Sequence, residues 1–443
     1  MAYISQILFV TAFGIANYFI FKSVMRIRKN ILLGKDINRS DRPSERLKMM
    51  ALVAFGQKKM FKKFIPAILH LFIYLGFLIV NVEMLEIMLD GIFGTHRIFL
   101  PLLGSMYLYL INMFEFFAVA VIVTCIIFLI RRTVLKVNRF NGLEMTRKPK
   151  VDANIILVTE IFLMIAFLTM NAADLNLQTL GLEDFKATGD FFFSGILKGL
   201  LSGISASGLL ALERACWWFH ILGVLLFANY VLWDSKHLHI FLAFPNTYYS
   251  KLEPAGQFVN MPEVTYEVKL MLNIPVETPE TPAVAAKFGA KDVMDLTWKN
   301  LLEAYTCTEC GRCTQQCPAN ITGKKLSPRK IMMDTRDRLV EVGLGKEING
   351  NEFSDGKSLL GDYISEEEIL ACTTCNACVE ACPVNINPVD IIMKLRQYKI
   401  MEESQMPQSW QMMASNIENN FAPWKFSPAD RFNWAEKINK ESF

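Results

Sequence analysis

Eight of the ten cysteines fall into two runs of identical spacing. The first run reads CTECGRCTQQCP, the second reads CTTCNACVEACP, and both have the form C-x2-C-x2-C-x3-C-P. Their cysteines are Cys307, Cys310, Cys313 and Cys317 in the first run, and Cys372, Cys375, Cys378 and Cys382 in the second. Thiolates at this spacing hold pairs of 4Fe-4S clusters. The pattern therefore predicts one-electron chemistry at two iron-sulfur sites.

Each predicted ligand set draws on both runs. Three thiolates of one run hold three corners of a cube, and the fourth, turned away by the following proline, reaches the other cube. The first set is Cys307, Cys310, Cys313 and Cys382, and the second is Cys372, Cys375, Cys378 and Cys317. Structural zinc uses two pairs of ligands separated by a loop and would leave four of these thiols poorly placed. Disulfides are disfavoured on a cytoplasmic face, where thiols stay reduced.

Four of the five histidines, His70, His220, His237 and His239, lie in or beside apolar segments. Paired imidazoles on facing helices are a common way to hold heme in a helical bundle. His220 and His237 are 17 residues apart, which is about 25 Å along a helix, so one heme cannot use both. His237 and His239 should lie on different faces of one helix, with only one facing the bundle. The alternatives are unrelated core histidines for His70 and His220, and a hydrated membrane-edge pair for His237 and His239.

The elements that must position these residues begin with apolar helices. Hydrophobic residues make up 52% of the chain and are concentrated before Asp234, in stretches near the roughly 20 residues that cross a bilayer. Five spans are predicted, at Ile4 to Val24, Ile65 to Leu89, Met106 to Ile130, Ile155 to Ala172 and Leu209 to Trp233. A cleaved signal peptide is disfavoured because no basic residue precedes the first stretch and a cationic run follows it.

Charge sets the expected orientation. The segment from Lys22 to Phe64 holds 13 Lys or Arg against three acids, and such basic loops stay in the cytoplasm. Five crossings then place the N-terminus outside and everything after Trp233 inside. Phe191 to Ile204 is apolar but short, so we expect a helix at the membrane surface. The net charge of +3 gives no indication of nucleic-acid binding, since the basic residues flank the spans.

The soluble half is predicted to be helical. Phe244 to Gly256 and Ile274 to Asp292 are rich in Pro, Gly and Thr and suit an extended connector. Helices are expected before Cys307, from Ser327 to Gly343, and on both sides of the second cysteine run. The predicted fold is all-α: a five-helix transmembrane bundle in residues 1–250, a connector in 251–295, an α-helical two-cluster domain in 296–400 and a tail in 401–443.

With these residues in view, the membrane half resembles the heme b gamma subunit of respiratory nitrate reductase. The soluble half is similar to the helical cluster subunits of heterodisulfide reductase and glycerol-3-phosphate dehydrogenase. The fusion resembles membrane iron-sulfur oxidoreductases related to heterodisulfide reductase, including bacterial proteins that link electron-transfer flavoprotein to menaquinone. The sequences WKNLLEAYTCTECGRC, SKHLHIFLAFPN and APWKFSPADRFNWAE carry the likeness. The resemblance implies heme b on His70 and His220, menaquinone as substrate and a location in the bacterial inner membrane.

Two departures from that pattern matter. The nitrate reductase subunit has a further histidine about three turns before the position of His70, where this chain has Met60. A second heme on Met60 with His237 or His239 is one interpretation, and a plain apolar Met60 is the other. Larger relatives continue into cysteine-rich modules, so the resemblance implies a separate cytoplasmic iron-sulfur subunit as partner, bound by the tail.

Other candidate chemistry is limited. Glu115, Glu160 and Arg214 lie in spans and could handle protons or quinone, or could simply pair with other helices or with heme propionates. Cys125 and Cys216 are expected to be buried apolar residues. No phosphate loop or dinucleotide fingerprint has supporting context. The two functions considered are an electron-transfer subunit and a membrane redox sensor or transporter. Internal repeats or broken spans would favour the transporter, and none is evident.

Overall fold

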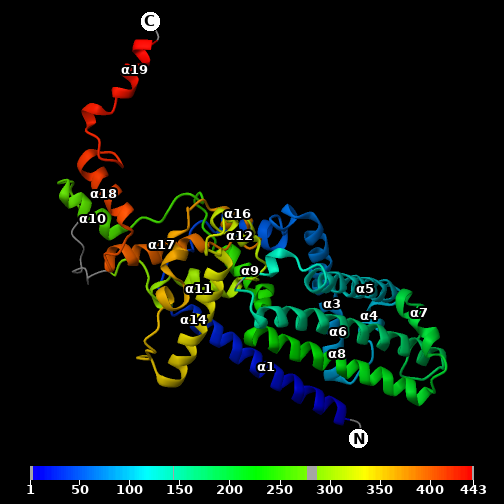
Figure 1. Cartoon of the computed structure of the whole chain (residues 1–443). Coiled ribbons are helices and arrows are strands. Elements are labelled where there is room, and N and C mark those ends of the chain that lie inside the picture. The colour runs from blue at the N-terminus through cyan, green and yellow to red at the C-terminus, as the bar shows by residue number, and fades with distance from the viewer. Residues whose placement is uncertain (1–2, 143, 277–286, 442–443) are drawn as a thin grey trace.

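The computed structural model describes residues 3–142, 144–276 and 287–441. Helices account for the regular structure throughout these ranges, which contain only two isolated β-bridges and no strand. The predicted all-α fold is therefore confirmed. Figure 1 shows a bundle of long helices at one end of the molecule and a group of shorter helices at the other.

Five helices are long and apolar enough to cross a membrane. They are α1 (Ile4–Ile31), α3 (Phe64–Phe93), α5 (Met106–Thr133), α6 (Arg147–Thr179) and α8 (Ala206–Asp234). Each contains a predicted span and extends beyond it, so the five spans are confirmed. Helix α1 starts at the end of the bundle that lies far from the cluster domain and lies beside α8 (Figure 1). We call that far end the outer end, following the predicted orientation.

Two short helices sit at the outer end, α4 (Leu100–Leu103) and α7 (Phe192–Leu201). The predicted surface helix corresponds to α7, which packs against α5 and α6. Its other face is apolar and exposed at Phe192, Ile196 and Leu200. A helix with one face on the bundle and one uncovered apolar face suits the membrane boundary.

Irregular helices connect the two halves at the inner end. They are α2 (Pro43–Met50), η1 (Ala51–Phe55), η2 (Met60–Lys62), η3 (Asn138–Phe140), η4 (Lys236–Leu238), α9 (His239–Tyr248) and α10 (Pro262–Met271). The prediction of an extended chain from Phe244 was wrong over 244–248, which belongs to α9, whereas α10 lies between the two stretches that were predicted to be extended. Helix α9 continues through Pro245, because its other residues pack on α2 and α11. Part of the connector, 277–286, lies outside the described residues.

The cluster domain surrounds the two cysteine runs. Its helices are η5 (Val293–Asp295), α11 (Trp298–Thr306), α12 (Arg312–Gln315), α13 (Pro318–Ile321), α14 (Pro328–Asn349), η6 (Leu359–Tyr363), α15 (Glu366–Leu370), α16 (Ala377–Ala381) and α17 (Pro388–Gln397). The tail forms η7 (Tyr398–Glu402), α18 (Gln408–Asn420), η8 (Pro428–Asp430) and α19 (Asn433–Glu441), which extend away from the domain (Figure 1). Thr297, Ser327, Ser365 and Asn387 cap α11, α14, α15 and α17 through side-chain hydrogen bonds.

One predicted helix end was wrong. Gly343 does not stop α14, which continues to Asn349. A side chain at Gly343 would collide with the side chain of Asn30 near the end of α1. The glycine therefore permits close packing between a spanning helix and the cluster domain.

The cluster domain and the inner helix ends share one hydrophobic core. Ile27 of α1, Leu232 of α8 and Ala243 of α9 belong to the same buried cluster as Leu301 and Ile391 of the cluster domain. A shared core fixes the orientation of the cysteine runs relative to the spans, because interiors are close-packed.

Candidate cluster and heme sites

The first pocket lies between α12, α14 and the chain after α16. It is lined by Cys307, Cys310, Cys313 and Cys382, with Cys378 at its edge toward the second pocket. Three of these thiols belong to the first run, and Cys382 comes from the second. The structure thus brings together all four residues of the first predicted ligand set.

The second pocket is lined by Cys317, Cys372, Cys375 and Cys378. Here three thiols come from the second run, and Cys317 comes from the first. Cys378 lines both pockets, so the two sites are direct neighbours. Cys375 is the one exposed cysteine of the eight, which places the second pocket near the protein surface.

The two runs have the same backbone turns. Glu309 and Gly311 have positive φ in the first run, at 53° and 71°, and Thr374 and Asn376 have φ of 55° and 60° at the equivalent places in the second. Left-handed residues on both sides of Cys310 and of Cys375 curl each loop around its pocket. Only Gly311 and Asn376 are residue types that favour this conformation, so the sequence signalled half of these turns.

The pockets suit a cluster better than a single metal ion. Within the described residues, no three His, Cys, Asp or Glu side chains converge closely enough for one ion, whereas a 4Fe-4S cube is itself large and spaces its four thiolates widely. Burial raises the pKa of Cys307 and Cys378 to about 12 and that of Cys382 to about 11. Without metal these thiols stay protonated. The positive charge of bound iron is therefore needed to displace the protons and to stabilise the thiolates.

The first pocket is tied to the membrane half by buried ions. Glu309, inside the first run, accepts from Arg336 at 2.9 Å and lies 3.5 Å from the ammonium of Lys236, which follows α8. Arg312 donates to the carbonyl oxygen of Met60 at 3.2 Å, and Lys59 donates to the carbonyl oxygen of Val379 at 3.3 Å. The loop between α1 and α3 therefore reaches both cysteine runs.

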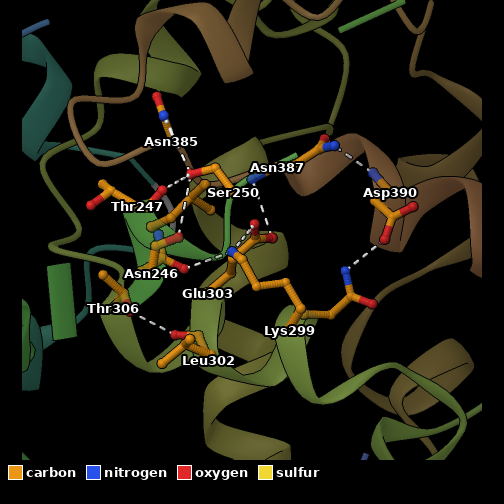
Figure 2. A network of polar contacts seen from close by, with 12 residues as sticks. Asn246, Thr247, Ser250, Lys299, Leu302, Glu303, Thr306, Asn385, Asn387 and Asp390 are labelled. Carbon is orange, nitrogen blue, oxygen red and sulfur yellow. Dashed lines mark hydrogen bonds and ion pairs between the residues drawn. The ribbon is translucent and has the colours of Figure 1, made fainter. Parts of the chain in front are cut away.

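A polar network attaches the loop of Cys382 to α9 (Figure 2). Lys299 is buried, and its ammonium contacts Asn246 at 2.8 Å and Glu303 at 2.6 Å. Asn246 donates in turn to the carbonyl oxygen of Val384 at 2.7 Å. Glu303 accepts from the backbone N–H of Asn387 at 3.3 Å. These bonds hold the chain after Cys382 against the helix that begins at His239.

Three histidines come together at the inner end of the bundle. The ring of His239 lies 6.5 Å from that of His70 and 5.1 Å from that of His237, measured between centroids. The prediction that only one of His237 and His239 faces the bundle was wrong. The helix ends at Asp234, Ser235 is extended, and η4 redirects the chain so that both rings gather at one place.

The nitrogen atoms of these histidines are suited to metal binding. Nδ1 of His70 is 3.2 Å from the amide oxygen of Gln57, and Nδ1 of His239 is 3.4 Å from the carbonyl oxygen of Lys236. Such bonds leave Nε2 as the free lone pair. Nδ1 of His237 is buried without a hydrogen-bond partner among the described residues. Burial lowers the pKa of His237 well below its usual value and that of His239 to about 4, so both rings are neutral.

His220 lies deeper, against α6. Its Nδ1 donates to the carbonyl oxygen of Leu163 at 2.9 Å, its ring is 6.0 Å from that of Phe167, and Nε2 is buried with no partner in the described part of the chain. No contact joins it to His70 within the described residues, so their pairing stays a prediction. An orphaned imidazole nitrogen in a buried site fits a metal ligand.

No sequence pattern marks Gln57, which is buried and has φ of 50° in the turn before η2. Met60, which the sequence offered as a ligand of a second heme, is the first residue of η2. Its sulfur makes no hydrogen bond or ring contact among the described residues. Cys125 is fully buried in the bundle core, as expected, whereas Cys216 is only half-buried and packs against the same core.

The fold and the cysteine pattern define a multi-pass helical membrane protein with an iron-sulfur domain. Residues 306–386 match the family of 4Fe-4S dicluster domains, so the chain carries such a domain. No solved structure matches the chain.

Three relatives show the wider relation. A probable iron-sulfur-binding oxidoreductase FadF of Bacillus subtilis is 30% identical over 97% of this chain and 60% of its own. An EtfAB:quinone oxidoreductase of Syntrophomonas wolfei is 26% identical over 95% of this chain and 58% of its own. A component of the dihydromethanophenazine:CoB–CoM heterodisulfide reductase of Methanosarcina mazei is 28% identical over 34% of this chain and 37% of its own. The chain is thus related to iron-sulfur oxidoreductases akin to heterodisulfide reductase, and it spans about 60% of the length of the first two relatives.

Proposed function

We propose that this chain is the electron-transfer subunit of a membrane-bound, quinone-linked oxidoreductase. Electrons pass between a cytoplasmic redox partner and the quinone pool through two 4Fe-4S clusters and heme b. The observation that carries the proposal is the position of the two cysteine pockets beside three histidines at the inner end of a five-span bundle. The names of the relatives, an oxidoreductase and a quinone oxidoreductase, support it.

The proposed cluster ligands are the two mixed sets. One cluster binds Cys307, Cys310, Cys313 and Cys382, and the other binds Cys372, Cys375, Cys378 and Cys317. The protein sets the distance between the clusters and excludes water from them, while the clusters carry the electrons.

The surroundings of the pockets suggest the order of electron transfer. The first pocket adjoins Lys236 and the loop before α3, so we assign its cluster to the membrane side. The second pocket has the exposed Cys375, so we assign its cluster to the soluble partner.

The tail supports this assignment of the partner side. Arg396 donates to the carbonyl oxygen of Cys372 and lies 5.8 Å from the ring centroid of Trp410 in α18. The tail beyond it exposes large apolar side chains such as Phe421 and Trp434. We propose 401–443 as the segment that binds a cytoplasmic partner beside the second cluster.

The histidine geometry refines the heme proposal. The ring centroids of His70 and His239 are 6.5 Å apart, so both imidazoles could bind one heme iron. We therefore favour His70 with His239 over His70 with His220 as the ligand pair of heme b, with His237 as the competing partner. His220 is the candidate ligand of a second heme deeper in the bundle. Heme supplies a one-electron carrier there.

The soluble partner and the quinone are proposed from the relatives. The name of the Syntrophomonas wolfei relative joins an EtfAB flavoprotein to quinone. We propose electron-transfer flavoprotein, together with a cysteine-rich iron-sulfur subunit, on the cytoplasmic side and menaquinone in the bacterial inner membrane. The N-terminus then lies outside and the cluster domain inside.

The heme proposal is tested by reduced-minus-oxidised absorption spectra of the purified chain. A b-type spectrum is expected in the wild type and its loss in His70→Ala and His239→Ala. His96→Ala, in the loop after α3, is the control that keeps the spectrum. Loss in His220→Ala with retention in His239→Ala would restore the pairing expected from the sequence. No heme spectrum in well-loaded wild type contradicts the heme proposal.

The electron route is tested by quinone turnover in membranes that carry the chain with its partners. Cys310→Ala should abolish turnover, and Cys125→Ala, in the bundle core, should keep it. Unchanged turnover in Cys310→Ala contradicts the route and favours a redox sensor or transporter.

A further inference from the structure

The outer end of the bundle buries more negative than positive side chains. Six carboxyl groups there are at most 8% exposed, namely those of Glu83, Glu86, Asp90, Glu115, Asp174 and Glu213. Arg97, in the loop after α3, is 6% exposed and is the buried cation that meets them among the described residues. Isolated charges inside a bilayer are costly, so each carboxyl needs a partner or a proton.

The guanidinium of Arg97 makes hydrogen bonds to side chains of α5 and α6. Its Nε donates to Asp174 at 2.6 Å, one Nη donates to Asn171 at 3.0 Å, and the other donates to the hydroxyl oxygen of Tyr107 at 3.0 Å. The guanidinium therefore neutralises Asp174 at close range, and its hydrogen bonds among the described residues go to α5 and α6 rather than to a carboxyl of α3.

Two of the α3 carboxyls have their own donors. Asp90 accepts from the Thr95 hydroxyl at 2.5 Å and from two backbone N–H groups, at 2.9 and 3.1 Å. Glu86 accepts from the Tyr107 hydroxyl at 2.8 Å and from the N–H of Phe99 at 2.9 Å. Hydrogen bonds of this kind stabilise a carboxylate without a counter-ion.

Glu115 of α5 is satisfied in a similar way. It accepts from Asn171 at 3.2 Å and from the N–H groups of Phe193 and Ser194, at 2.9 and 3.1 Å. These two N–H groups belong to the first turn of α7. The N-terminal end of a helix carries a partial positive charge, which stabilises a carboxylate. Of the two roles considered for Glu115, these bonds favour pairing with another helix, because they anchor α7 to the bundle.

Glu83 is the exception. It is 2% exposed, and its Oε2 is buried with no hydrogen-bond partner among the described residues. Glu86, Asp90 and Glu115 are buried carboxyls near it, and Arg97 is a buried cation near it. None of these four groups donates a hydrogen bond to Oε2 of Glu83.

The other packed elements do not change this balance. From α8, Glu213 pairs with its neighbour Arg214. His96 lies 4.0 Å from Asp174, which also pairs with Arg97. Helix α1 has no charged residue before Lys22, near its inner end. Within the described ranges, no cation from these helices reaches Glu83.

The geometry points to Glu83 as a proton-binding site on the outer side of the bundle, neutral at rest and able to release and rebind its proton. A buried carboxyl without donors holds its charge poorly, and a proton is the ligand that resolves this. A bound metal cation is disfavoured, because no three acidic or histidine side chains of the described residues form a site for one. Glu83 lies 19 residues from the start of α3, which is about 28 Å along the helix, so the site is remote from the cysteine pockets.

The proton that Glu83 binds could come from either of two donors, and both would leave Glu83 in the same protonated form. One is water at the outer surface, and the other is the hydroxyl of a hydroquinone in the bilayer. The proposed site consists of Glu83 alone, and proton binding there does not depend on heme at the histidine group. Its test is therefore separate from that of the proposed function.

Infrared difference spectroscopy of the full chain in lipid nanodiscs tests the site. A band from the C=O stretch of a protonated carboxyl is expected, shifted by D2O and changing with external pH. Glu83→Gln should lose this band, Glu83→Asp should retain it in shifted form, and Glu213→Gln should leave it unchanged. Cluster absorption in each variant reports whether it is folded.

Spectra without quinone and with an added menaquinone analogue distinguish the two sources. A response to pH without quinone assigns the proton to water, and a response that needs the reduced analogue assigns it to the hydroquinone. Three results overturn the inference: a wild type without the band, a band that persists in Glu83→Gln, or a band that follows sodium concentration instead of pH.

Discussion

Asp334 shows at the scale of one residue how burial and pairing compete in the cluster domain. Burial raises its pKa to about 6, although Lys330 donates to it at 2.7 Å. Lys330 divides its charge between Asp334 and Glu368, which is 3.0 Å away, and so its own pKa is raised. Desolvation therefore outweighs the attraction of Lys330 for Asp334.

The consequence is a pH-dependent stability. The folded state binds the Asp334 proton more tightly than the unfolded chain, so its contribution to stability is largest below about pH 4 and declines through about pH 6. The wild type should lose about 2 to 3 kcal/mol relative to Asp334→Asn over this range. Denaturant-induced loss of cluster absorption in both proteins measures the difference. Parallel pH curves would contradict the assignment.

Not all residue-scale features were visible in the sequence. The spacing of the cysteines anticipated how the two runs share two pockets, because fixed loops limit where each thiol can lie. The meeting of His237 with His239 was missed, since it depends on Ser235 leaving the helix. Gln57 was missed because its role comes from a turn between elements, and no local pattern marks it.

At the scale of elements, the contact between α1 and α14 is one of the links between the membrane half and the cluster domain. Asn30 of α1 donates to the hydroxyl oxygen of Tyr305 at 2.8 Å and lies against Gly343 of α14. The helix periods predicted both helices, but the sequence suggested Gly343 as a terminator. The position of Asn30 in the structure shows that the missing side chain at Gly343 leaves space for α1 to pack against α14.

Gly343→Ala should therefore destabilise the protein by about 1 to 3 kcal/mol, the usual range for overpacking a core. The added methyl group must displace Asn30 and its bond to Tyr305. Gly14→Ala in α1 is the matched control, because nothing lies within 4 Å of that position, and its helix propensity should rise. Thermal loss of cluster absorption compares the two, and equal transition temperatures would argue against the packing role.

At the scale of the whole molecule, a buried ion pair secures the loop after α5 to the cluster domain. Glu144 accepts from Arg329 at 2.7 Å and from the Ser327 hydroxyl at 2.6 Å, and both ions are under 10% exposed. Burial opposes ionisation, but these two partners lower the pKa of Glu144 below its ordinary value. The apolar spans could be predicted from composition, whereas this junction depends on residues 183 or more positions apart.

Glu144→Ala should cost about 3 to 5 kcal/mol, because it leaves Arg329 buried without its counter-ion. Glu367→Ala is the control, since its pair with Lys325 is exposed at the surface and should contribute little to stability. Hydrogen exchange at the start of α14 should increase in the first variant only. The same exchange in both variants would show that the junction is held elsewhere.

The sharing of cysteines between the two pockets has a consequence for biosynthesis. Each pocket takes one thiol from the other run, so the ribosome must reach Cys378 before the second site is complete and Cys382 before the first site is complete. By then all five apolar helices have left the ribosome and can already lie in the bilayer. Iron and sulfide would then be delivered to an apo-protein already anchored at the membrane, and both clusters would be built in one late step of maturation.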